Sequence, residues 1–182
     1  CGSLQGEVLL PASLTTVCNH AFSYAREITK IRFADSDAAQ RSLRFEDFAF
    51  ANCSSLQEIV FPKNLTALEV PGGSTYGWCE ALTQLTIPGS LQEVDAGMGF
   101  QYMGYVQKIT VEEGITAVAG GSLPTRYLQE AALPHSLEEI AERLFNSAGN
   151  LQKVYPTGEE PEEGVAVKLP EGIVSIGTYA FY

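Results

Sequence analysis

Residues 49–65, AFANCSSLQEIVFPKNL, contain a phrase that the rest of the chain repeats. The stretch joins a turn-like A-F-x-x-C segment to an extended L-x-x-I-x-F-P segment. Neither segment has enough apolar residues to form a core alone, and copies of both recur before and after it. Internal repeats of this kind indicate a stacked array in which neighbouring units bury each other's apolar faces.

The extended segment recurs at a nearly constant interval. Its final position, proline in most copies, is occupied in turn by Pro11, Ala34, Pro62, Pro88, Glu112 and Pro134, with intervals of 22 to 28 residues. This spacing lies in the range of about 20–29 residues that leucine-rich repeats use. A second apolar segment, S-L-x-x-V, follows most copies. We therefore expect a leucine-rich-repeat solenoid of mixed β structure with a strand and a short helical or turn segment per unit, about seven irregular repeats of roughly 22–28 residues, forming one domain over residues 1–182.

The first residue, Cys1, belongs to the same repeat position as Cys53 and Cys79. It follows the place where an A-F-x-x segment would end, and the chain stops at YAFY, residues 179–182, just before the next such position. Cys1 could be a lipidated N-terminal residue, or the chain could begin inside a repeat. The shared position favours the second interpretation, so we expect a segment of a longer array.

The phrases of residues 49–65 and 169–182, LPEGIVSIGTYAFY, resemble the BspA-like leucine-rich repeat family of bacterial surface proteins. The resemblance covers nearly the whole chain. It implies a secreted or cell-surface location and a non-enzymatic role in adhesion, with an extracellular protein or glycan as the partner. The alternative is a structural spacer within a larger surface protein. The family has no catalytic motif, so the resemblance transfers no functional residues and implies no cofactor.

Three segments depart from the repeat: ADSDAAQRS at 34–42, EVPGGSTYGW at 69–78 and PTGEEPEEGVAV at 156–167. Loops added to a scaffold are common places for function. The last segment carries Glu159, Glu160, Glu162 and Glu163, which could hold calcium but lack the alternating Asp/Asn and glycine pattern of calcium loops. A solvated loop of mutually repelling carboxylates is therefore the favoured interpretation.

The net charge argues against two classes of partner. The chain has a formal charge of −11 and a pI near 4.5. Nucleic acids and anionic membrane surfaces both require clustered Lys and Arg, so neither is expected as a partner. No apolar run approaches the roughly 20 residues of a spanning helix, so direct membrane insertion is not expected either. The sequence does not indicate an oligomeric state.

Residues that could carry chemistry do not cluster. His20 and His135 lie five repeats apart, so a histidine-based nucleophile relay is not expected. The chain also has no cysteine or histidine cluster at metal-ligand spacing. Cys53 and Cys79 occupy equivalent positions in adjacent repeats and could form a disulfide, although small buried hydrophobic residues are the favoured interpretation. We expect no catalytic, cofactor or metal site.

Two rows of residues are the candidate partner-binding surfaces. The first is the aromatic row before the cysteine position, namely Tyr24, Trp78 and Tyr102. Such side chains are favoured in recognition surfaces, although they could instead pack on one another and seal the edge. The second row is the outward strand positions Lys30, Glu58, Gln84 and Lys108, which could face a partner or be ordinary solvated surface.

Overall fold

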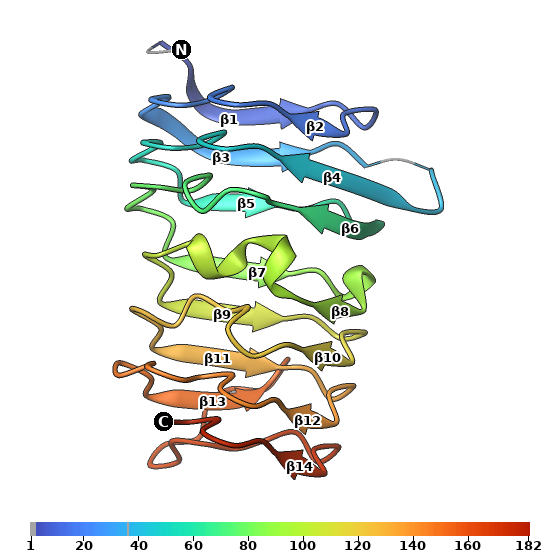
Figure 1. Ribbon diagram of the computed structural model, residues 1–182, viewed down its shortest axis with the longest axis vertical. Helices are drawn as coiled ribbons and strands as arrows, with labels where there is room; N and C mark the ends of the chain where they lie inside the picture. The colour runs from blue at the N-terminus through green and yellow to red at the C-terminus, as the bar shows by residue number, and fades with distance from the viewer. Residues whose placement is uncertain (1–2, 36) are drawn as a thin grey trace.

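The computed structural model describes residues 3–35 and 37–182, so Cys1 lies outside the described residues. Figure 1 shows a solenoid in which two columns of strands run side by side from the N-terminal to the C-terminal end. Each repeat supplies one strand to each column and then a turn segment that leads to the next repeat. The predicted leucine-rich-repeat solenoid is confirmed, and seven strand pairs agree with the predicted number of repeats.

The first column contains the extended segments found in the sequence. Its strands are β1 (Gln5–Leu10), β3 (Glu27–Phe33), β5 (Glu58–Val60), β7 (Gln84–Ile87), β9 (Lys108–Val111), β11 (Glu130–Leu133) and β13 (Lys153–Pro156). Among the described residues, the pairings between these strands are parallel. Side chains alternate between the two faces of a strand, so Ile59 is buried whereas its neighbour Glu58 is exposed.

The second column was not predicted as strands. It consists of β2 (Thr16–Val17), β4 (Arg41–Phe45), β6 (Leu65–Glu69), β8 (Glu93–Val94), β10 (Ala117–Val118), β12 (Glu139–Ile140) and β14 (Ser175–Ile176). Five of these strands have only two residues, which is too short for an alternating pattern to be visible in the sequence. In the described residues, helix is limited to three short 3₁₀ segments of the fourth repeat, η1 (Gly89–Leu91), η2 (Ala96–Met98) and η3 (Phe100–Tyr102).

The core of the first three repeats is built from stacked aromatic rings. The Phe45 ring lies between those of Phe33 and Phe61, with centroids 5.8 and 6.4 Å away. A second stack runs through Phe22, Phe50 and Tyr76. Phe45 also meets the rings of Phe50 and Tyr76 edge-on, which joins the two stacks. In the second stack, equivalent positions of successive repeats place rings on top of one another, whereas in the first stack Phe45 comes from the second column.

The excursion at residues 34–40 is tied to the solenoid by one buried side chain. Arg41 is 6% exposed, and its guanidinium donates hydrogen bonds to the carbonyl oxygens of Ala34, Pro11 and Leu14 at 3.0–3.2 Å. The guanidinium also lies over the Phe33 ring. Burial lowers the pKa of Arg41 from its usual value. The side chain thus holds three carbonyls of two successive repeats together.

Both columns are interrupted at the same level after the third repeat, and the second column is interrupted again between β10 and β12. The strands β5 and β7 are neighbours but belong to separate sheets, and so do β6 and β8. Across this level, the Val70 N–H donates to the Gly97 carbonyl at 2.8 Å and the Ser90 hydroxyl to the Leu65 carbonyl at 2.6 Å. Isolated hydrogen bonds therefore take over part of the role that the strand ladders have elsewhere.

In the part of the chain that the structure describes, no helix has the length and apolar character needed to cross a membrane.

Candidate functional site

The predicted aromatic row lies on an exposed edge of the solenoid. Trp78 and Tyr24 are each 57% exposed, and Tyr102 is 41% exposed. Among the described rings, no stacked pair forms between these three side chains. Tyr24 lies beside Arg26, whose guanidinium is 5.7 Å from the ring centroid. Mutual packing of the row, the other interpretation of the sequence, is therefore not what holds these rings in place.

The backbone at this repeat position is unfavourable for large side chains. Trp78 has φ 60° and Tyr24 has φ 62°, both in the left-handed region. Asn52 and Ser147 occupy the same position in other repeats with φ values of 60° and 62°. Asn tolerates this conformation, whereas bulky residues rarely adopt it. Neither burial nor backbone preference therefore explains a Trp at position 78.

Trp78 and Tyr102 face a common hollow, whereas Tyr24 does not. The hollow has a volume of about 340 Å³ and is also lined by Tyr105 and Tyr127. The Tyr105 and Tyr127 rings are stacked with centroids 6.1 Å apart. We call these four aromatic residues and the space between them the aromatic hollow.

The sequence analysis did not single out Tyr105 and Tyr127. Both stand directly before a buried apolar residue of the extended segment, Val106 and Leu128 respectively, in adjacent repeats. A tyrosine repeated at one position of neighbouring units, exposed at Tyr127 and partly buried at Tyr105, was the signal that could have identified them.

The wall of the aromatic hollow uses one of the departures from the repeat. The segment 69–78 contributes Gly73, Ser74 and Gly77 to the lining. A Cβ atom at Gly73 would lie 3.3 Å from Cε1 of Tyr102, so glycine lets this ring lie close against the backbone. The inserted segment therefore shapes the surface on which Tyr102 rests.

Arg126 is the charged residue of this lining. Its guanidinium carbon lies 5.3 Å from the centroid of the Tyr127 ring. Among the described ion pairs, none involves Arg126, although the chain has 22 acidic and 11 basic residues. In the part of the chain that the structure describes, no carboxylate lines the aromatic hollow. The hollow therefore combines exposed ring faces with one positive charge.

The predicted strand-face row is aligned by the sheet register. Lys30 pairs in register with Glu58, and Gln84 pairs with Lys108. Lys30 forms an ion pair with Glu58 at 2.7 Å, and Lys108 pairs with Glu130 at 3.2 Å. Three of the four predicted residues thus have their charges neutralised by a neighbour on the same face.

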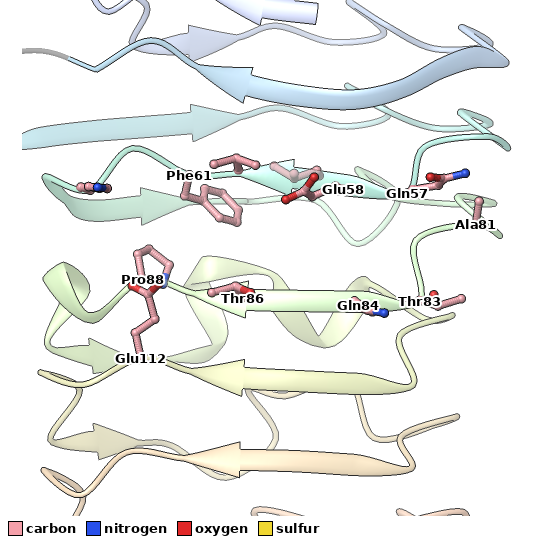
Figure 2. Close-up of a pocket in the computed structure, with 12 residues that line it drawn as sticks. Gln57, Glu58, Phe61, Ala81, Thr83, Gln84, Thr86, Pro88 and Glu112 are labelled. Atoms are coloured by element: carbon pink, nitrogen blue, oxygen red, sulfur yellow. The ribbon is translucent and has the colours of Figure 1, made fainter. Parts of the chain in front are cut away.

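A groove interrupts this row where β5 and β7 are unpaired. Figure 2 shows Glu58 and Phe61 on one side of it and Gln84, Thr86 and Pro88 on the other. The groove has a volume of about 660 Å³. Its lining is mixed in polarity and includes the edges of two strands that do not bond to each other. The row therefore brings Glu58 and Gln84 together, while Lys30 and Lys108 lie outside the groove.

The two buried cysteines are free thiols, so the possible disulfide is not formed. The Cys53 thiol donates to the Phe22 carbonyl, and the Cys79 thiol donates to the Phe50 carbonyl, each at 3.1 Å. Burial raises the pKa of Cys53 to about 11 and that of Cys79 to about 12. Each cysteine is a small core residue that also binds the preceding repeat.

The acidic segment near the C-terminus is held by cations, which corrects the predicted loop of repelling carboxylates. Lys168 forms ion pairs with Glu159 at 2.7 Å and Glu162 at 2.8 Å. Glu159 also lies 3.8 Å from Nε2 of His135, whose Nδ1 is 2.9 Å from Glu113. Within residues 3–35 and 37–182, no group of His, Cys, Asp and Glu side chains could hold a metal ion.

The His135 contacts predict a pH dependence. Its hydrogen bond with Glu113 raises the pKa of His135 above the usual 6.5. Because the folded state favours the charged imidazole, its stabilising contribution is complete below pH 6.5 and is lost as the pH rises through the folded pKa. An NMR titration of the ring protons should give a raised pKa that falls towards the usual value in Glu113→Gln. An unchanged pKa in that variant would contradict the assignment.

Comparisons with known proteins agree with the solenoid fold. The family model described as the BspA type leucine rich repeat region matches residues 1–71 and 44–159, with six copies. The crystal structure of a leucine-rich repeat protein from T. pallidum is 20% identical, covers 94% of this chain and 72% of its own, and has a TM-score of 0.59. A leucine-rich repeat protein from Bacteroides ovatus is 21% identical with a TM-score of 0.55, over 94% of this chain and 47% of its own. No curated protein sequence matches the chain.

Proposed function

Because the chain belongs to the BspA-type leucine-rich repeat family, we propose that it is a non-enzymatic binding module of a bacterial surface or secreted protein. Its partner is an extracellular protein or glycan, and the aromatic edge is the face that recognises it. Repeat solenoids present long surfaces that suit such contacts. The alternative is a spacer role, which the mutually neutralised charges of the strand face favour.

One observation carries the proposal. Trp78 has a left-handed backbone that costs about 1–2 kcal/mol in a residue with a Cβ. It is more than half exposed, so burial does not offset this cost. Trp and Tyr supply much contact area at a small loss of conformational entropy, which makes them frequent binding hot spots. Recognition of a partner accounts for a Trp where Asn would fold more easily.

The test is a binding assay on immobilised matrix proteins, mucins and glycans. The wild-type domain is expected to bind at least one of them saturably, and Trp78→Asn combined with Tyr102→Ala should weaken that binding at least tenfold, as the loss of two hot-spot residues does. Trp78→Asn alone should keep or raise the melting temperature, because Asn tolerates the left-handed backbone.

The matched control is Tyr179→Asn. Tyr179 is also aromatic, has φ 56° and is 54% exposed, but it lies at the C-terminal end of the solenoid. This variant should bind as the wild type does. Tyr24→Asn is measured in the same assay. A loss of binding in this variant would show that the recognition face extends along the edge as far as Tyr24. If the wild type binds nothing on the panel, the spacer role replaces the proposal.

A further inference from the structure

We propose that the aromatic hollow is a saccharide site that takes a sugar ring carrying a carboxylate, with the ring on Trp78 and Tyr102 and the carboxylate on Arg126. This inference rests on the proposed function, because it names the ligand class of the same exposed edge. The four aromatic side chains, the glycine-rich lining and the position of Arg126 support it.

The exposed ring faces suit the flat side of a sugar. A pyranose directs several C–H bonds to one face, and these weakly positive hydrogens pack on the negative face of an aromatic ring. Tyr105 and Tyr127 are already stacked on each other, so their arrangement is set before a ligand arrives. Gly73 backs the Tyr102 ring at close range, which fixes that ring against the chain. A preformed set of rings lowers the entropic cost of binding.

The space between the rings suits a small polar ligand. A volume of about 340 Å³ is near the lower limit of small-molecule sites, which range over about 300–1,000 Å³. Ser74, Gly77 and Gly104 also line the hollow. The Gly77 N–H and carbonyl and the Gly104 N–H already bond within the protein, so the Ser74 hydroxyl is the group of these three residues that can exchange hydrogen bonds with sugar hydroxyls. One or two sugar residues fill such a site, whereas a protein partner needs a far larger area of about 800 Å² on each side.

Arg126 gives the proposed site a higher affinity for acidic than for neutral sugars. A guanidinium pairs with a carboxylate through two parallel N–H···O bonds, which is stronger and more specific than a neutral hydrogen bond. Among the described residues, no Asp or Glu forms an ion pair with Arg126, and the lining contains no acid. The net charge of the chain is −11, which disfavours an anionic ligand over most of the surface. This repulsion is smallest beside Arg126, whose charge is not neutralised by an acidic partner.

The experiment is a titration monitored by ¹H–¹⁵N NMR and saturation-transfer difference. The ligands are the methyl glycosides of glucuronic, galacturonic and N-acetylneuraminic acid, with methyl glucoside and methyl galactoside as the neutral counterparts. At least one acidic glycoside should bind, with shifts at residues around the hollow, and its neutral counterpart should bind about tenfold more weakly.

Three variants assign the contacts. Arg126→Gln should reduce binding of the acidic glycoside to the level of the neutral one, and Trp78→Asn should weaken both. Arg26→Gln is the matched control, because Arg26 is also exposed and lies over a tyrosine ring, Tyr24, that does not line the hollow. This variant should bind as the wild type does.

Several outcomes would overturn the inference. They are equal binding of acidic and neutral glycosides, acidic binding that is unchanged in Arg126→Gln, or no saturable shift with any glycoside at millimolar concentration. If the glycosides fail while a protein on the panel binds and loses binding in the Trp78 variant, the saccharide assignment fails and the proposed function stands. If neither glycoside nor panel binds, both fail.

Discussion

Replacing Phe45 with alanine is expected to lower the free energy of unfolding by about 3–5 kcal/mol, the range for truncating a buried phenylalanine. The Phe45 side chain is fully buried and lies at the junction of the two aromatic stacks. The substitution removes contacts with four rings of two successive repeats at once, and the stacked neighbours cannot close the cavity without leaving their own positions. Urea unfolding monitored by circular dichroism would measure the loss.

Phe48→Ala is the control for this prediction. Phe48 lies three residues away and stacks on His20 at the surface, with ring centroids 4.9 Å apart. The substitution should lower the free energy of unfolding by less than about 1.5 kcal/mol, because a partly exposed ring pair contributes little beyond the contact between its two rings. Equal losses in the two variants would show that the buried stack does not dominate the stability of these repeats.

Arg41→Ala is expected to lower the free energy of unfolding by about 3 kcal/mol, whereas Arg44→Ala in the same strand should lower it far less. Arg41 is buried and donates to three backbone carbonyls, so its removal takes this donor from the partly buried carbonyls of Ala34 and Leu14, whereas the Pro11 carbonyl keeps the Leu14 N–H. Arg44 is partly exposed and pairs with Glu69, a contact that solvent screens. Both variants require the same unfolding measurement.

Added salt separates the two arginines further. The contribution of Arg44 should fall as salt screens its ion pair, whereas that of Arg41 should change little because its partners are neutral carbonyls. A loss in Arg41→Ala no larger than that in Arg44→Ala would mean that the excursion at residues 34–40 is held by other contacts.

The solenoid could be predicted because its core repeats one residue type at one position. Ile59, Leu85 and Ile109 occupy the same place in three repeats, and all are buried. The second column could not be predicted, since Thr16–Val17 and similar strands form hydrogen bonds with other repeats and have almost no local pattern. Contacts between repeats set the pairing of these strands, and they override the local preference of the residues for strand or turn.

The candidate site was predicted in part. Trp78 and Tyr102 were placed on one edge, and the structure agrees, but the row also contained Tyr24, which lies away from the hollow. Tyr105 and Tyr127 stand at a different repeat position from Trp78 and Tyr102, so the pattern of the aromatic row does not include them. The sequence of β7 also gives no sign that this strand does not pair with β5, because Leu85 and Ile87 match the other extended segments.

The interruption between β5 and β7 bears on how the chain loses its structure. In a repeat protein, stability is close to a sum of unit terms and nearest-neighbour coupling terms. At this level the coupling lacks ladder bonds in both columns and rests on contacts such as the edge-on Phe61 and Phe100 rings. The array is thus two cooperative blocks in series, joined by its weakest coupling. The destabilisation caused by Phe45→Ala therefore falls on the first block, and its unfolding curve would separate from that of the second.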